Sequence, residues 1–174
     1  VGKTTTSVNL AASLADAGKK VLLVDLDPQG NATMGSGVDK RNVSNTVYQV
    51  VLGLSTAEKV RVHSDTGGYD LLPANRELAG AEVELVELDH RETRLRSALE
   101  PIATQYDFIL LDCPPALNML TVNGLVAADA VMIPMQCEYY ALEGLSDLVN
   151  TIKRVRQNLN PKLEIEGLLR TMYD

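Results

Sequence analysis

The sequence predicts an α/β fold in three layers, with a mostly parallel sheet covered by helices on both faces. Short apolar runs alternate along the chain with longer segments of helical spacing. Val21–Val24 is apolar at every position, which is typical of a strand that is covered on both faces. Parallel strands need crossover connections, and the helical segments between the runs can supply them. A length of 174 residues holds one full core, so we expect a single domain over residues 1–174.

The elements follow from apolar periodicity and from Gly and Pro positions. The first helix is expected over Thr4–Ala17, with Gly18 as its C-terminal stop. Further helices are expected at 45–52, around Ala57, at 78–88, at 91–102 with Pro101 closing it, and at 142–159. Strands are expected at 21–24, 69–73, 108–111, 131–133 and 163–170. The stretch 30–44 is rich in Gly, Asn, Ser and Asp, and is expected to be loop.

Composition limits the function classes. The net charge of −7 argues against strong nucleic-acid binding by this segment alone. Apolar runs are too short to cross a bilayer, so no membrane partner is expected. Cys113 and Cys137 have no CxxC neighbour and are interpreted as free thiols rather than metal ligands.

The first residues have the form of the second half of a phosphate-binding loop. Gly2 lets the backbone approach an anion closely, and the helix that follows directs free amides at it. Lys3 would place its charge on the β- and γ-phosphates of a nucleotide, and the Thr4 hydroxyl would bind Mg²⁺. Thr5 completes the expected phosphate-binding set. The bland alternative is an ordinary helix start, since such a tetrapeptide is weak by itself.

Three acidic residues lie at expected strand ends. Asp112 follows four apolar residues, which is the form of a Walker B strand whose carboxylate holds Mg²⁺ directly or through water. Asp25 and Asp27 end the strand at 21–24 and are two residues apart, so they are expected on one side. Two carboxylates near one metal suggest separate tasks, one in the water shell of the metal and one orienting the attacking water.

Four stretches together resemble the ParA/Soj partition ATPases, in the deviant-Walker-A group of P-loop ATPases that also holds MinD. The stretches are VGKTTT at 1–6, DLDPQGN at 25–31, LDCPP at 111–115 and QCEYYALEGL at 136–145. The resemblance covers the whole chain in order, and the second and fourth stretches favour ParA over MinD. The family loop reads K-G-G-V-G-K-T, so a signature lysine is expected before Val1. The first strand and start of the loop, and further C-terminal elements, are therefore expected to lie outside residues 1–174.

The resemblance also implies roles and partners. Lys3 matches the phosphate lysine within the subunit, Thr4 the Mg²⁺ ligand and Asp112 the Walker B carboxylate. Asp27 matches the carboxylate that positions the hydrolytic water, and Asp25 would support the metal shell. Family members are slow, cytoplasmic, nucleoid-associated ATPases that dimerise on ATP, bind DNA nonspecifically and respond to a ParB-type centromere-binding protein.

Two other functions remain open at this point. A metabolic ATP-dependent ligase of the dethiobiotin-synthetase or cobyrinate-amidating kind shares the fold and the loop. A degenerate paralogue that only binds would lack the chemistry of Lys3, Thr4, Asp27 and Asp112. For DNA contacts, Lys153, Arg154 and Arg156 with Arg170 are candidates, although a solvated helix face is the favoured interpretation.

Overall fold

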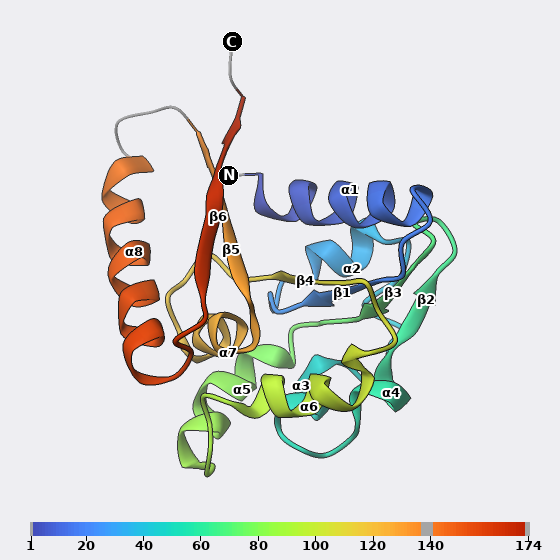
Figure 1. Cartoon of the computed structure of the whole chain (residues 1–174). Helices are drawn as coiled ribbons and strands as arrows, with labels where there is room; N and C mark the ends of the chain where they lie inside the picture. Colours follow the sequence, from blue (N-terminus) through green and yellow to red (C-terminus); the bar gives the residue numbers. More distant parts are fainter. Residues whose placement is uncertain (1, 137–140, 173–174) are drawn as a thin grey trace.

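The computed structural model describes residues 2–136 and 141–172, and Figure 1 shows their arrangement. Cys137 and residues 138–140, part of the fourth stretch above, lie outside the described residues. The helices are α1 (Lys3–Asp16), α2 (Asn31–Gly35), α3 (Val47–Val51), α4 (Ala57–Val60), α5 (Leu78–Glu84), the 3₁₀ turn η1 (Leu85–Glu87), α6 (Arg94–Ala103), α7 (Met119–Ala127) and α8 (Ala141–Asn158). The strands are β1 (Val21–Asp25), β2 (Val62–Ser64), β3 (Tyr69–Leu72), β4 (Phe108–Asp112), β5 (Ala130–Gln136) and β6 (Glu164–Thr171).

The strands form two hydrogen-bonded groups. The first has the order β2-β3-β1-β4, in which β1 runs parallel to both β3 and β4. The second pairs β5 with β6, also in parallel. Only the short β2 is antiparallel among the described strands, and it joins β3 through a tight turn. The predicted mostly parallel sheet is confirmed.

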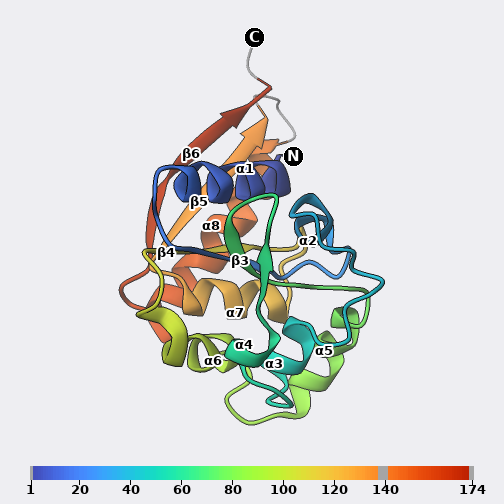
Figure 2. The same ribbon diagram turned by 90° about the vertical axis from the view of Figure 1, so that its right-hand side faces the viewer.

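The first sheet lies between two layers of helices, as Figures 1 and 2 show. Side chains of β1 alternate between the layers because successive residues of a strand point to opposite faces. Val21 and Leu23 pack with α1 and α2, whereas Leu22 and Val24 join the larger core between the sheet and helices α3 to α7. Every residue of β1 is buried, which explains its continuous apolar sequence.

A third core joins the second sheet to its own helix. Ile133 of β5 packs with Ile152 and Val155 of α8 and with Leu125 of α7. Asn160 fixes this corner, because its amide nitrogen has two hydrogens to donate and lies 2.7 to 3.2 Å from the carbonyl oxygens of Leu125, Val126 and Ala128 at the end of α7. The far ends of β5 and β6 reach the N-terminal side of α1 (Figure 1).

Two expectations about elements were wrong, and neither strand β2 nor helix α7 was among the expected elements. The stretch 30–44 contains the short helix α2, whose Thr33 is fixed by contacts with Asp25 at the end of β1 and Ala74 after β3 rather than by local propensity. Pro101 lies inside α6, which continues to Ala103. Helix α7 was not expected because it is buried on nearly all sides and so lacks an amphipathic stripe.

Candidate functional site

Helix α1 begins at the residues expected to bind phosphate. Gly2 is its N-cap, in the left-handed conformation at φ 79°, and no side chain caps the helix. The amides of the first turn of this 14-residue helix are therefore available to an anion, and the positive end of its dipole lies at the same place. Thr5 is exposed, whereas Lys3 and Thr4 are half-buried.

Thr4 and Asp112 meet at the centre of this site. Strand β4 ends at Asp112, and the Thr4 hydroxyl donates to Asp112 Oδ2 at 2.9 Å. Ser7, one turn further along α1, donates to Asp112 Oδ1 at 3.0 Å. The sequence-predicted metal pair is thus brought together across two elements, and Ser7, which sequence reasoning missed, joins it.

The pKa of the Asp112 carboxyl shows which charged groups lie near it. Burial raises the pKa of its carboxyl, while the hydrogen bonds from Thr4 and Ser7 lower it. The negative charge of Asp27 raises the same pKa and the ammonium of Lys3 lowers it. Lys3 and Asp27 therefore both lie close enough to Asp112 to act on its carboxyl. No hydrogen bond within the described chain engages the Lys3 ammonium, which leaves it available for a ligand.

Asp25 lies beside Asp112 in the register of β1 and β4, but its carboxylate is fully occupied within the fold. Its Oδ2 accepts from the Thr33 amide at 2.9 Å and hydroxyl at 2.7 Å, and its Oδ1 accepts from the Asp27 amide at 3.1 Å. Burial raises the pKa of Asp25 to about 6, although these hydrogen bonds lower it. The structure thus shows Asp25 holding α2 and the Asp27 turn in place.

Asp27 follows the strand, in the turn that leads into α2. Its Oδ1 accepts from the Gln29 amide at 2.9 Å, and no hydrogen bond among the described residues reaches Oδ2. The ammonium of Lys40 donates to the Gln29 carbonyl of the same turn. Asp25 and Asp27 therefore do not share one environment: the first is buried and the second is half-buried with a free oxygen.

Thr171, at the end of β6, lies against the start of α1. A Cβ atom built on Gly2 would lie 3.0 Å from Thr171 Cγ2, so this close approach, together with the positive φ, favours glycine. The Thr171 hydroxyl oxygen is buried without a hydrogen-bond partner in the described part of the chain. An unpaired buried hydroxyl is unfavourable unless a ligand or water satisfies it. The open helix end, the Lys3 ammonium that no described residue engages and this hydroxyl together fit a bound nucleotide.

Several features lie apart from this site. Within residues 2–136 and 141–172, no three His, Cys, Asp or Glu side chains come together to hold a metal ion, so a cation here would depend on Thr4, Asp112 and phosphate oxygens.

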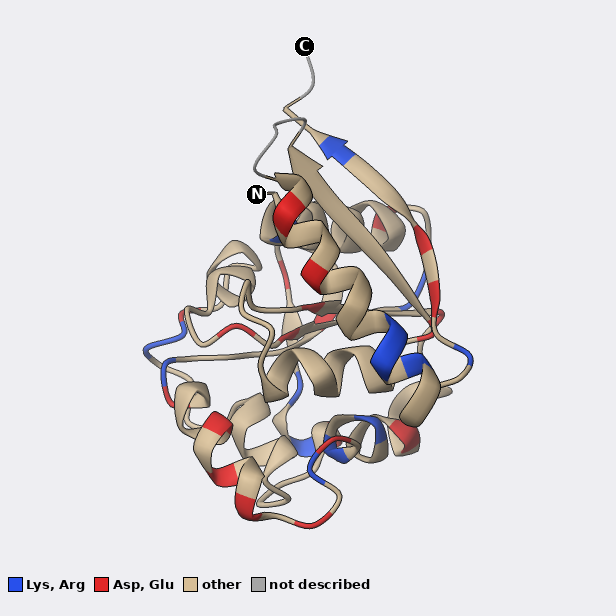
Figure 3. Cartoon of the chain, turned by 90° about the vertical axis from the view of Figure 1, so that its left-hand side faces the viewer, with Lys and Arg blue, Asp and Glu red and all other residues tan. Residues whose placement is uncertain are grey.

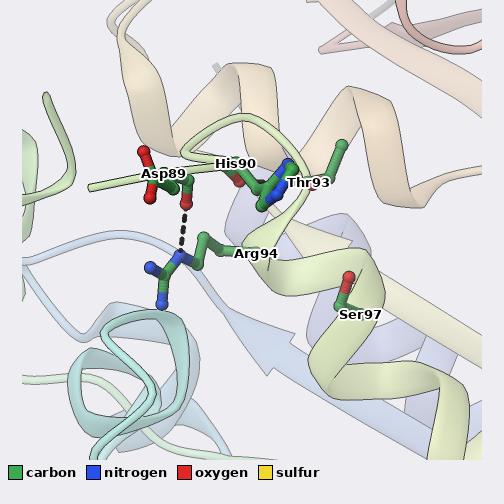
Figure 4. Close-up of a pocket in the computed structure, with 5 residues that line it drawn as sticks. All are labelled: Asp89, His90, Thr93, Arg94 and Ser97. Atoms are coloured by element: carbon green, nitrogen blue, oxygen red, sulfur yellow. Dashed lines mark hydrogen bonds between the residues drawn. The ribbon is translucent and has the colours of Figure 1, made fainter.

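Figure 4 shows a pocket of about 480 Å³ where the Arg94 guanidinium donates to the Asp89 carbonyl at 3.1 Å. A second pocket lies at the opposite edge of the sheet, where β1 begins at Val21. Neither belongs to the phosphate site.

The basic residues of α8 are exposed near its C-terminal end, with Glu143 and Asp147 nearer its start (Figure 3). Arg170 is near the far end of β6, and a strand rises about 3.3 Å per residue. Arg170 is therefore about 20 Å further along than the start of β6, away from the basic end of α8. The candidate DNA-binding residues therefore do not form one patch. They are Lys153, Arg154, Arg156 and Arg170. None of the described helices is long and apolar enough to span a membrane.

A helix that opens on Gly-Lys-Thr beside a strand-end aspartate defines a P-loop nucleotide site. A model of the AAA domain family matches residues 1–165. The chain is 54% identical over 174 residues to the chromosome partitioning protein ParA of Myxococcus xanthus, and 53% identical to the sporulation initiation inhibitor protein Soj of Bacillus subtilis. It belongs to the ParA/Soj family of AAA-domain proteins. It spans 62% and 69% of the length of these two relatives, and 66% of an uncharacterized Pseudomonas putida protein at 63% identity.

Solved structures support the same fold. A cobyrinic acid a,c-diamide synthase from Mycobacterium smegmatis, with bound ADP and magnesium, matches 99% of this chain and 70% of its own at a TM-score of 0.95 and 43% identity. A plasmid partition protein from Borrelia burgdorferi matches 99% of this chain and 74% of its own, with a TM-score of 0.82 and 26% sequence identity. McdA of Cyanothece, with a TM-score of 0.91 and 23% sequence identity, supports the fold alone.

Proposed function

We propose that the chain carries the ATP- and Mg²⁺-binding site of a partition ATPase. The observation that carries the proposal is the 2.9 Å hydrogen bond from Thr4 to Asp112, formed at the open end of α1 beside the free Lys3 ammonium. ParA and Soj relatives, and a similar structure with ADP and magnesium, support the same ligands.

The residues divide the work. Lys3 and the amides of the first turn of α1 bind the phosphates, and Gly2 keeps the approach to them open. Thr4 and Asp112 would hold Mg²⁺: the Thr4 hydroxyl donates its hydrogen bond to Asp112, which leaves its oxygen lone pairs available to the metal. When bound, Mg²⁺ offsets the charge of the β- and γ-phosphates. Asp27 uses its free Oδ2 to orient the attacking water, because no other group of the described chain engages that oxygen.

The finer function is an ATP-dependent switch in chromosome or plasmid partitioning. ATP drives formation of a homodimer, the dimer binds DNA nonspecifically, and a ParB-type protein stimulates hydrolysis and release. Hydrolysis by the monomer is slow, since a signature lysine expected before Val1 would complete the phosphate site from the partner subunit. Nonspecific contacts to phosphates predict binding that weakens steeply with salt.

The test uses Asp27→Ala in the intact protein. The variant should bind ATP and dimerise like the wild type while ATP hydrolysis, with DNA and a ParB-type protein present, falls to background. Asp16→Ala, an exposed position at the end of α1, is the control and should leave hydrolysis unchanged. Normal turnover by Asp27→Ala would refute the role assigned to that carboxylate.

The second candidate is an ATP-dependent ligase. It is favoured by one observation, the 43% identity to a structure named as cobyrinic acid a,c-diamide synthase. Such an enzyme would phosphorylate a small carboxylate, so its ATP turnover would depend on that substrate rather than on DNA. Turnover stimulated by cobyrinic acid, and unaffected by DNA with a ParB-type protein, would replace the partition proposal.

A further inference from the structure

Two hydroxyls on one face of α1 bind the two oxygens of a single carboxylate. Thr4 donates to Asp112 Oδ2 at 2.9 Å and Ser7 donates to Asp112 Oδ1 at 3.0 Å. Residues three apart in a helix lie on the same face, which brings both hydroxyls to the end of β4. A carboxylate that is held at one oxygen can rotate about its own bonds, whereas one held at both has a defined plane. The plane of Asp112 is therefore set by α1.

Ser7 has a choice of acceptors. Its hydroxyl lies 3.0 Å from the Lys3 carbonyl, in the pattern of a helix back-bond, and 3.0 Å from Asp112 Oδ1. A hydroxyl carries one proton, so it makes one of these bonds at a time. The carboxylate is the stronger acceptor because it is charged and only 2% exposed. Ser7 thus connects the second turn of α1 to the strand end rather than serving the helix alone.

We propose that Ser7 is a positioning residue for the metal site: it fixes the plane of the Asp112 carboxylate so that this group and Thr4 are preset for Mg²⁺. The inference rests on the proposed function, since it needs Asp112 and Thr4 to hold the metal. Ser7 itself would not touch Mg²⁺ or nucleotide. Loss of such supporting hydrogen bonds around metal ligands typically lowers metal affinity by roughly 10- to 100-fold.

The experiment measures Mg²⁺ affinity separately from nucleotide affinity and from turnover. A fluorescent ADP analogue is bound to the intact protein, first in EDTA and then during a Mg²⁺ titration. We expect Ser7→Ala to raise the half-saturating Mg²⁺ concentration about tenfold while the affinity for ADP in EDTA stays the same. Ser7→Thr keeps the hydroxyl and should restore the wild-type titration. Ser13→Ala, an exposed serine of the same helix, should change neither value.

The outcomes separate this inference from the function on which it rests. A Ser7→Ala titration that overlays the wild type, when the wild type itself responds to Mg²⁺, would overturn the role of Ser7 alone. A wild-type protein whose ADP affinity is the same with and without Mg²⁺ would overturn both this role and the proposed function. Alanine is a better helix former than serine, so loss of folding is not expected, and circular dichroism checks it.

Discussion

The hydroxyl of Thr4 and the carboxylate of Asp112 lie 2.9 Å apart although 108 positions separate the two residues in the chain. This hydrogen bond joins the first turn of α1 to the last residue of β4. Parallel pairing of β4 with β1 places Asp25 directly beside Asp112. One bond therefore links the start of α1 to β4 and, through the pairing of β4 with β1, to the strand that carries Asp25.

Replacing Thr171 should raise the stability of the ligand-free protein and weaken nucleotide binding. Its buried hydroxyl has no partner in the described chain, so Thr171→Val removes an unsatisfied group and should stabilise the ligand-free protein by about 1 kcal/mol. The same change should weaken ATP binding if the hydroxyl serves the ligand. Thermal unfolding with and without ATP measures both effects, and Thr171→Ser is the control. A variant that binds ATP as well as the wild type would remove Thr171 from the site.

Asp25 gives the fold a pH dependence of known sign. Its pKa is about 6 in the folded protein and 3.8 ordinarily, so its contribution to stability is complete below about pH 4 and is lost as the pH rises through 6. A shift of about two pH units corresponds to roughly 3 kcal/mol. We therefore expect the free energy of unfolding to fall between pH 4 and pH 7. A change that strengthens hydrogen bonding to the charged Asp25 carboxylate should make this fall smaller.

Thr33→Val tests this prediction. The hydroxyl donates to Asp25 at 2.7 Å, which favours the charged carboxylate, and it accepts from the Ala74 amide at 2.9 Å. The variant should raise the pKa of Asp25 further and lose more unfolding free energy at pH 7.5 than at pH 4, while Thr33→Ser behaves like the wild type. Denaturant unfolding at the two pH values is the measurement. An equal loss at both would show that Asp25 does not titrate as described.

Two glycines should respond to alanine in opposite directions. Gly2 is left-handed, and a Cβ there meets Thr171, so Gly2→Ala should destabilise the protein by about 1–2 kcal/mol and weaken nucleotide binding. Gly144 lies exposed in α8 with no atom within 4 Å of its added Cβ, so Gly144→Ala should stabilise by roughly 0.5–1 kcal/mol. Calorimetry compares them. Similar melting temperatures for the two variants would contradict both assignments.

Asn160 should be sensitive to charge rather than to size. Its amide nitrogen, with two hydrogens to donate, lies within hydrogen-bond distance of three carbonyl oxygens at the end of α7, and the residue is 7% exposed. Asn160→Asp would set a carboxylate against those three acceptors, so we expect a loss of about 3 kcal/mol or more at pH 7 that shrinks toward pH 4. Asn158→Asp, at the exposed end of α8, is the matched control and should cost little. An equally small loss at position 160 would contradict the assigned contacts.

Much of the architecture follows from local patterns. The strand ends at Asp25 and Asp112 can be read from the sequence because each follows an apolar run with a clear boundary. The first helix is predicted from Thr4, one residue after its observed start at Lys3. These boundaries also predict that Thr4 and Asp112 meet, since parallel strands and the following helix converge at one edge.

The remainder depends on packing that no local pattern encodes. Thr33 and the helix that contains it are fixed by Asp25 and Ala74 from other elements, so residues 30–44 are predicted as loop from composition. Asp25 and Asp27 both follow the same apolar run in the sequence. In the structure Asp25 accepts two hydrogen bonds from Thr33, whereas Oδ2 of Asp27 accepts none from the described residues. Ser7 had a usable signal, since it lies one helical turn after Thr4 on the same face.

The most direct test of the central claim is a crystal structure of the intact protein with a nonhydrolysable ATP analogue and Mg²⁺. We predict the phosphates at the start of α1 with Lys3 Nζ in contact, Mg²⁺ bound by Thr4 Oγ1 with Asp112 directly or through water, and Asp27 facing the γ-phosphate. A metal–nucleotide complex bound elsewhere, or one in which Thr4 and Asp112 do not approach the ion, would contradict the account.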